Sequence, residues 1–341
     1  MNQNRKPVLS CPWCKSKKGG VFATRKDDVE IKKCGRCGLL YAGKTPEDIS
    51  EFYKKEYFEK EESAQSEMGY MSYTRAGLQN TIWQATIVSL LSQPGSSLLD
   101  VGCATGDFIE VMGFMGWKTE GIELSTWASA VARNRNLKVS NDPIEKLNRS
   151  QRFEIITAWE LIEHVQNLKK TLLQIKKHLG LKGIFLFSTP LVENYNLSIE
   201  HLYFFEKKWL EINLSRFFKR KVIIFGPTKH LTTRVGIVLP KSWPGTTMLK
   251  PKFFEKLLEL ETIIGIAANQ YTQDRLATQL NELKKSPQEW KKQIESLIVE
   301  KEGLIKQISE IKRSLSWKIT GPMRKIGAYA KKPHRNKKKK A

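Results

Sequence analysis

Long apolar runs are missing from the sequence. Within its 341 residues no apolar stretch reaches the roughly 18 residues that a membrane span requires, and residues 1–10 lack the apolar core of a secretory signal peptide. Cysteine is scarce as well. Four of the five cysteines form two CxxC pairs, and the fifth, Cys103, stands alone, which argues against a disulfide framework. These absences predict a cytoplasmic protein.

Acidic residues are few compared with basic ones. The chain has 35 Asp and Glu against 58 Lys and Arg, a net charge of +23. The excess is uneven, because residues 241–341 contain 23 basic and 10 acidic residues. A basic C-terminal region predicts an anionic partner, either the headgroups of an anionic membrane surface or nucleic acid.

One stretch organises the rest of the chain, residues 98–108. An apolar strand runs into a glycine turn with the spacing DxGxxxG, formed by Asp100, Gly102 and Gly106, and a helix follows directly. Gly102 lets the backbone approach a ligand closely, and the free N–H groups of the helix face the crevice at the end of the strand. An acidic residue before the first glycine suits a ligand with an amino group and a sulfonium better than a pyrophosphate.

The turn resembles motif I of class I S-adenosylmethionine (SAM) methyltransferases. A second acidic residue, Glu123, follows about 20 residues later at the end of the next strand, where it can take ribose hydroxyls. The resemblance implies that Asp142, after a third strand, contacts the adenine, although it could also cap the following helix. We further expect Cys103 and Trp159 to line the cofactor site. A Rossmann-like domain of another kind remains the alternative.

Strands and helices alternate from about residue 97 to 240. This pattern predicts an α/β fold, a parallel sheet with helices on both faces, closed by an antiparallel pair at 221–225 and 234–239. A helix at 168–179 is expected to end at Gly180. The set matches the seven-stranded class I methyltransferase sheet, here with an N-terminal zinc ribbon and a C-terminal coiled-coil helix.

Two CxxC knuckles lie 19 residues apart near the N-terminus. They supply four thiolates, which can close a tetrahedral zinc site and stabilise a module too small to fold on its own core. A redox role is the weaker alternative, since neither pair has a βαβ context. The predicted zinc ligands are Cys11, Cys14, Cys34 and Cys37.

An ExxEH cluster follows the fourth predicted strand. Glu160, Glu163 and His164 should therefore face the ligand crevice. The cluster resembles the EH motif of ubiquinone-biosynthesis O-methyltransferases and the metal-binding ExxEH of small-RNA 2'-O-methyltransferases, in which a later histidine completes a Mg site; His201 has a comparable place here. His164 or His201 could act as a general base with a pKa near neutrality, the four residues could hold a divalent ion such as Mg²⁺, or Glu163 and His164 could only brace the loop.

Apolar residues beyond residue 275 follow alternating steps of three and four. This spacing predicts a coiled coil and self-association into a homo-oligomer. Residues 314–326 mix apolar residues with cations and resemble the ends of enzymes of bacterial surface-polysaccharide assembly, which favours attachment to the inner face of a membrane. The predicted organisation is a zinc ribbon at 1–45, a helical cap at 46–95, a SAM-binding domain at 96–240, a linker at 241–275, a coiled coil at 276–316 and a basic tail at 317–341.

These features predict a SAM-dependent methyltransferase. The preferred acceptor is a hydroxyl of a sugar, or its phosphate, in a lipid-linked surface glycan, because attachment to the bilayer would bring the enzyme to such a glycolipid. Two alternatives stay open. One is an RNA methyltransferase whose ribbon and basic tail bind phosphates. The other is an inactive SAM-binding scaffold that recruits partner enzymes through the coiled coil.

Overall fold

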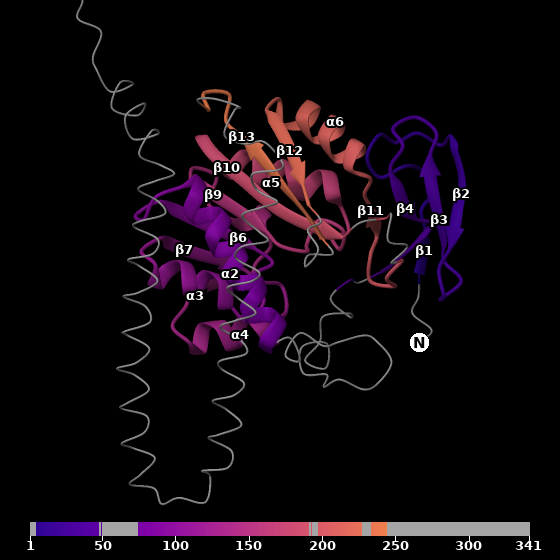
Figure 1. The fold of residues 1–341 in the computed structure, drawn as a ribbon. Helices are drawn as coiled ribbons and strands as arrows, with labels where there is room; N and C mark the ends of the chain where they lie inside the picture. Colours follow the sequence, from indigo (N-terminus) through magenta and orange to yellow (C-terminus); the bar gives the residue numbers. More distant parts are fainter. Residues whose placement is uncertain are drawn as a thin grey trace, which may run out of the picture. The chain divides into compact units, whose positions relative to one another are not determined.

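The computed structural model describes residues 5–47, 49, 74–190, 192, 197–226 and 233–243 (Figure 1). These residues all belong to one compact unit, Met1–Asn269. The predicted coiled coil and basic tail, most of the linker and residues 50–73 of the predicted cap lie outside the described residues. Within the described part of the chain, no helix is both long and apolar enough to cross a membrane.

A seven-stranded sheet forms the centre of the fold, in the order β12-β13-β10-β9-β6-β7-β8. All strands run parallel except β13, which is antiparallel to both of its neighbours. Read in chain order, this is the predicted class I arrangement with its closing antiparallel pair, and the prediction is confirmed. The strands are β6 (Ser97–Val101), β7 (Lys118–Ile122), β8 (Val139–Ser140), β9 (Phe153–Ala158), β10 (Leu179–Pro190), β12 (Lys221–Phe225) and β13 (Thr233–Leu239).

Helices cover both faces of this sheet, because successive strand residues point to opposite sides. Leu98 packs in a cluster with residues of α2 and α3, whereas its neighbour Leu99 packs in a second cluster with residues of α5 and α6. The central strands are therefore apolar on both faces, as buried parallel strands are. The helices are α2 (Thr74–Leu91), α3 (Asp107–Phe114), α4 (Thr126–Asn134), α5 (Leu168–His178) and α6 (Lys207–Phe218), with a 3₁₀ turn, η3 (Ile144–Lys146).

The N-terminal module is a small antiparallel sheet in the order β11-β4-β3-β2, beside a two-stranded ribbon of β1 and β5. Its strands are β1 (Arg5–Pro7), β2 (Gly19–Thr24), β3 (Glu30–Cys34), β4 (Leu40–Ala42) and β5 (Lys44–Pro46). The edge strand β11 (Tyr203–Phe204) comes from the methyltransferase-like part of the chain, between β10 and α6. Trp13 also packs against Trp209 of α6, with ring centroids 5.2 Å apart. The whole N-terminal module, which is the predicted zinc ribbon, is thus joined to the larger domain by both a strand and a core contact.

The expected glycine cap after α5 is wrong. Leu179 ends the helix in an extended conformation, and Gly180 already belongs to β10. A Cβ at Gly180 would lie 3.1 Å from the carbonyl oxygen of Phe153, so the glycine permits close strand contact. Gly180 therefore serves the packing of β10 against β9 and does not end the helix.

Candidate functional site

The glycine turn lies between β6 and α3, as the sequence predicts. Gly102 and Gly106 have φ angles of 78° and 90°, values that side chains rarely adopt. A Cβ at Gly102 would lie 2.8 Å from Leu161 Cδ1, and one at Gly106 would collide with the side chain of Leu137. The turn is therefore packed closely from two sides, by the loop after β9 and by the end of α4, and it accepts no larger residue without rearrangement.

Two carboxylates stand at the ends of adjacent strands beside this turn. Asp100 is 2% exposed, and its Oδ1 accepts a 2.6 Å hydrogen bond from the Thr157 hydroxyl. Burial raises the pKa of Asp100 to about 7, although the bond from Thr157 opposes the rise. Glu123 accepts hydrogen bonds from the backbone N–H groups of Ala104 at 2.9 Å and Ser125 at 2.8 Å. Burial raises its pKa, while these bonds lower it.

The other predicted cofactor residues differ in their surroundings. Cys103 points into the core, where its Sγ would be 2.5 Å from a Cβ added to Gly121, so only its backbone can face a ligand. Trp159 packs edge-to-face on Trp83, and its buried Nε1 has no hydrogen-bond partner among the described residues. Asp142 pairs with Lys146 at 2.6 Å and does not cap η3, so the capping alternative is wrong.

The loop after β9 brings three of the four predicted catalytic residues together. One ligand atom each of Glu163, His164 and His201 lies within 4.8 Å of the others. The imidazole rings of the two histidines meet edge-to-face with centroids 4.8 Å apart, and His164 Nε2 lies 3.9 Å from Glu163 Oε1. Glu163 is 1% exposed, and neither carboxylate oxygen has a hydrogen-bond partner of ordinary geometry within the described ranges.

Glu160 is outside this group of converging ligand atoms, although its charge is near enough to raise the pKa of Glu163. It has a left-handed backbone conformation with φ of 47°, and its N–H donates to the Ser188 hydroxyl at 3.0 Å. The side chain of Glu160 reaches solvent, yet loss of hydration at its carboxyl group raises the pKa to about 7. A hydrogen bond with the Ser188 side chain opposes this rise. The four-residue metal set predicted from the sequence is therefore reduced to three.

The protonation states of the cluster differ from those the sequence suggested. Burial lowers the pKa of His164 to about 4, against a bond to the backbone of Glu200, and burial followed by the nearby His164 lowers that of His201. Burial raises the pKa of Glu163 well above its ordinary value. Both histidines are thus neutral near pH 7. The pKa near neutrality expected for a general base is not found, because the sequence could not show how deeply these rings are buried.

Sequence reasoning missed Arg25, which links the ribbon to this cluster. Arg25 is 4% exposed and donates from Nη1 to the carbonyl oxygens of His201 at 2.9 Å and Ser198 at 3.2 Å. Asp27 pairs with the same guanidinium at 2.9 Å. The backbone of Leu202 in turn donates to the Glu163 carbonyl at 2.8 Å. The zinc ribbon therefore fixes the chain segment that carries His201. The sequence does not show this contact, because Arg25 and His201 are far apart along the chain.

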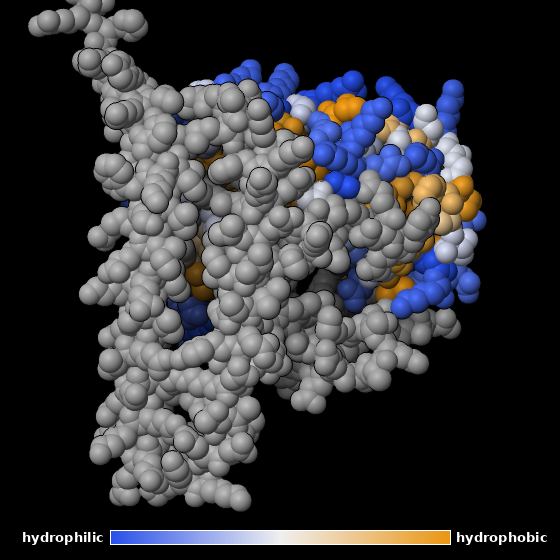
Figure 2. All heavy atoms as spheres, in the orientation of Figure 1, coloured by the Kyte–Doolittle hydropathy of each residue, from blue (hydrophilic) through white to orange (hydrophobic). Residues whose placement is uncertain are grey.

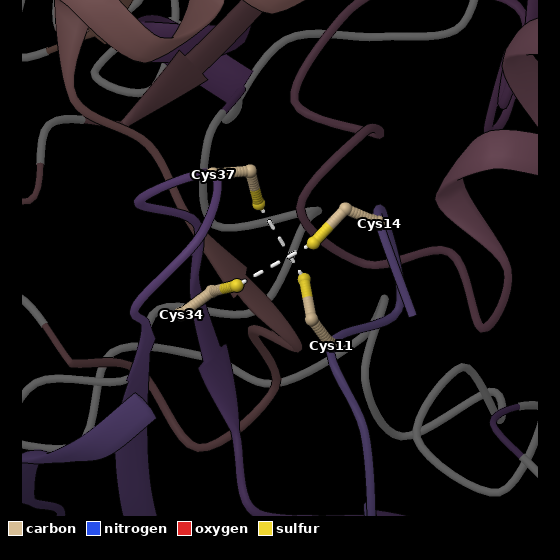
Figure 3. A group of neighbouring side chains, drawn as sticks. All are labelled: Cys11, Cys14, Cys34 and Cys37. Carbon is tan, nitrogen blue, oxygen red and sulfur yellow. Dashed lines mark hydrogen bonds between the residues drawn. The ribbon is translucent and has the colours of Figure 1, made fainter. Parts of the chain in front are cut away.

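The four predicted zinc ligands converge on one point (Figure 3). Cys11 and Cys37 have their Sγ atoms 3.6 Å apart, and those of Cys14 and Cys34 are 3.5 Å apart. A tetrahedral site with Zn–S bonds of about 2.3 Å has edges of roughly 3.8 Å, so the sulfurs need to move very little. Burial raises the pKa of Cys34, but N–H groups of Cys37 and Arg36 outweigh this and bring it to about 7, which favours a thiolate.

Comparison with known proteins finds a methyltransferase family and related enzymes. Residues 76–222 match the family described as a methyltransferase domain. The ubiquinone biosynthesis O-methyltransferase of Rickettsia bellii (strain OSU 85-389) is 31% identical over 99 residues, 27% of this chain and 41% of its own. The corresponding enzyme of Coxiella burnetii (strain Dugway 5J108-111) is 30% identical over 119 residues, 33% of this chain and 51% of its own.

Among solved structures, magnesium protoporphyrin IX methyltransferase (ChlM) from Synechocystis PCC 6803 with bound SAM has a TM-score of 0.43 at 10% identity, covering 57% of this chain and 98% of that one. The chain spans about half or less of the length of these curated relatives. The family match and the order of the seven strands identify residues 76–222 as a class I methyltransferase domain.

Proposed function

We propose that the protein is a SAM-dependent O-methyltransferase. The observation that carries this proposal is a pair of carboxylates, the buried Asp100 and the half-buried Glu123, at the ends of adjacent strands beside a glycine turn. Negative charge there attracts the amino group and sulfonium of SAM. A carboxylate has about four lone-pair sites, so Glu123 can keep its two backbone bonds and still accept two ribose hydroxyls.

Trp159 supplies a further test of whether SAM fits. Its buried Nε1–H lacks a partner within the described chain, and a buried donor without a partner is unfavourable by about 1–3 kcal/mol. An acceptor atom of a bound ligand would satisfy it. When bound, SAM would supply the electrophilic methyl group, and the chain's own task is to orient the acceptor hydroxyl and receive its proton.

His164 and His201 are the groups proposed to receive that proton. Both are neutral near pH 7, and a neutral imidazole has one ring nitrogen without a proton, which can accept a hydrogen bond from a hydroxyl. Glu163 lies beside His164, and once its own carboxyl group is ionised it can stabilise the imidazolium that forms, since an opposite charge raises the pKa of a histidine. The burial that lowers the resting pKa would thus be offset as the proton moves.

A metal-assisted mechanism uses the same three residues. Two imidazoles and one carboxylate are donors that suit Mn²⁺, Fe²⁺, Co²⁺ or Zn²⁺ better than Mg²⁺, which prefers oxygen ligands. The unpartnered oxygens of Glu163 fit a ligand role. Removing the metal by chelation and adding each ion back separates the two mechanisms, because proton transfer to a histidine needs none of them.

The cysteine group is proposed to hold one structural zinc ion. Its support is the convergence of four sulfurs, which lie 3.5 and 3.6 Å apart in pairs and all within 4.8 Å of one another. Zinc would connect the two knuckles, and through Trp13 it would stabilise the contact of the ribbon with α6.

The acceptor is proposed to be a sugar hydroxyl, or a sugar phosphate, in a lipid-linked glycan. The support is the basic, tryptophan-containing sequence at 314–341, which suits an anionic membrane surface. To test it, methyl-labelled SAM is added to a cell lysate with the purified protein, and lipid-glycan and RNA fractions are counted. Label in the lipid-glycan fraction supports the proposal, and label in RNA contradicts the acceptor. SAM binding without label in any fraction contradicts the enzyme and favours a scaffold.

A further inference from the structure

A cavity lies between the zinc ribbon and α6. Its volume is about 570 Å³, within the usual range of roughly 300–1,000 Å³ for small-molecule sites. Its walls come from both CxxC knuckles, from the first turn of α5 and from one side of α6. No role in SAM binding or in methyl transfer explains this hollow.

The lining of this cavity is strongly positive. Four exposed cations, Arg36, Lys169, Lys208 and Arg216, surround it. The single acidic lining residue, Glu206, is paired with Lys33 outside the cavity wall at 2.8 Å. Figure 2 shows that hydrophilic side chains gather on the described surface over α6 and beside the ribbon. A concave surface lined by one sign of charge concentrates ligands of the opposite sign.

A buried donor without a partner lines the same cavity. Trp209 is 4% exposed, and its Nε1 has no hydrogen-bond partner in the part of the chain that the structure describes. A Cβ at Gly38, another lining residue, would lie 3.9 Å from Trp209 Cδ1, the ring atom bonded to Nε1. The indole of Trp209 therefore lies against the cavity wall, with its Nε1 shielded from solvent.

Helix α6 begins at this cavity. Its N-cap residue, Glu206, makes no side-chain capping bond and lines the cavity, and Lys208, Trp209 and Arg216 line it along one side of the helix. The aligned dipoles of a helix favour an anion at this end. Four cations and the indole of Trp209 thus surround one hollow beside the start of α6.

We propose that this cavity binds a phosphate or diphosphate group, and, resting on the proposed function, that this group belongs to the methyl acceptor. Phosphate oxygens accept bonds from guanidinium, ammonium, indole and backbone N–H donors alike. The N-termini of α5 and α6 follow the carboxyl ends of the parallel strands, the same edge that carries His164. An open hollow of this limited size suits the phosphate of a small or lipid-linked acceptor, whereas a nucleic-acid backbone needs an extended groove.

The same cations could instead balance the negative charge of the zinc site, and the test must distinguish this role from phosphate binding. Zinc held by four thiolates carries a net charge of −2, and Cys14 and Cys37 line the cavity. Cations that served only to balance this charge would affect zinc retention but would not bind added phosphate.

The direct test observes the indole N–H of Trp209. The zinc-loaded full chain is labelled with ¹⁵N-tryptophan, Trp209→Phe assigns the resonance, and pyrophosphate is titrated. We expect a saturable downfield shift of the Trp209 signal. The indole of Trp117 already donates to Ser92 at 2.9 Å and serves as an internal control that stays in place. A Trp209 signal that does not move up to millimolar pyrophosphate overturns the proposal.

Charge reversal locates the binding. The double variant Arg36→Glu/Arg216→Glu should weaken the pyrophosphate affinity measured from this shift at least tenfold. Lys182→Glu, near the start of β10 and so at the opposite end of the parallel strands, should change the affinity less than twofold. Equal weakening by both would indicate unspecific charge attraction and overturn the proposal. So would loss of zinc from the double variant together with an unchanged pyrophosphate affinity, and so would an RNA oligonucleotide that shifts the Trp209 signal at lower concentration than pyrophosphate.

The lysate assay tests whether the bound phosphate belongs to the methyl acceptor. The double variant should lower labelling of the acceptor at least tenfold at limiting acceptor while SAM affinity stays unchanged, and added pyrophosphate should compete in the wild type. Pyrophosphate binding with no methyl transfer by the wild type contradicts the proposed function and leaves the anion site intact. Methyl transfer that neither the variant nor pyrophosphate affects contradicts the acceptor assignment alone.

Discussion

At the scale of single residues, the clearest consequence of burial concerns Asp100. Its pKa is raised to about 7, above the ordinary value of 3.8, first by burial and against the bond from Thr157. A carboxyl group with a raised pKa in the folded state favours folding below pH 4, and this contribution is lost as pH rises through 7. Ionised Asp100 therefore destabilises the free protein, and a bound cation would offset that cost.

Asp100→Asn should stabilise the protein at high pH. An amide oxygen can still accept the Thr157 hydrogen bond, while the cost of ionisation disappears. The gain in unfolding free energy over the wild type should grow by about 2–3 kcal/mol between pH 5 and pH 8. Urea unfolding at both pH values measures it. A gain that is equal at the two pH values would contradict a raised pKa.

Arg25 gives a second prediction at this scale. Arg25→Met removes the bonds to the His201 and Ser198 carbonyls and should lower turnover about tenfold, because the cluster loses its support and a displacement near 1 Å is costly in catalysis. SAM affinity should not change, and Arg25→Lys should restore part of the turnover. Lys17→Met, an exposed change in the same module, is the control. Unchanged turnover of Arg25→Met would show that the ribbon does not position His201.

At the scale of elements, the knuckles and β11 determine how the two parts of the chain meet. Cys11, Cys34 and Trp13 belong to the same core cluster as Trp209 and residues of α5. The metal site is therefore continuous with the core of the larger domain, and its loss should be felt beyond the ribbon.

Zinc removal tests this connection. Cys34→Ser should lower the zinc content from one per chain and lower the melting temperature by roughly 6–12 °C, as expected for a loss of about 3 kcal/mol in a domain of this size. Metal analysis and calorimetry measure the two effects, with Ser16→Ala as control. A variant that loses zinc and melts at the wild-type temperature would separate the metal from the core.

The sequence predicted those elements whose signals are local. The glycine turn, the strand order and the four thiolates follow from spacing and periodicity. What failed depends on distant contacts. The depressed pKa of His164, the separation of Glu160 from the cluster and the role of Arg25 all arise from packing between segments more than 25 residues apart or from burial, which no short pattern records.

At the scale of the whole molecule, a compact catalytic unit precedes a basic C-terminal region whose role rests on its sequence. Deleting residues 317–341 should release the protein from vesicles of anionic lipid, because the deletion removes lysines together with Trp317. Sedimentation with vesicles measures this, with neutral vesicles as control. Retention of the shortened chain would assign membrane contact to another region.

We propose that SAM binds in a crevice beside the carboxylates at the ends of adjacent strands. Calorimetric titration of SAM measures this binding. Glu123→Gln should weaken binding at least tenfold, about 1.4 kcal/mol, whereas Glu120→Gln on the same strand, an ion-pair partner of Lys138, should change affinity less than twofold. Equal affinity of Glu123→Gln and the wild type, or no SAM binding by the wild type, would contradict the account.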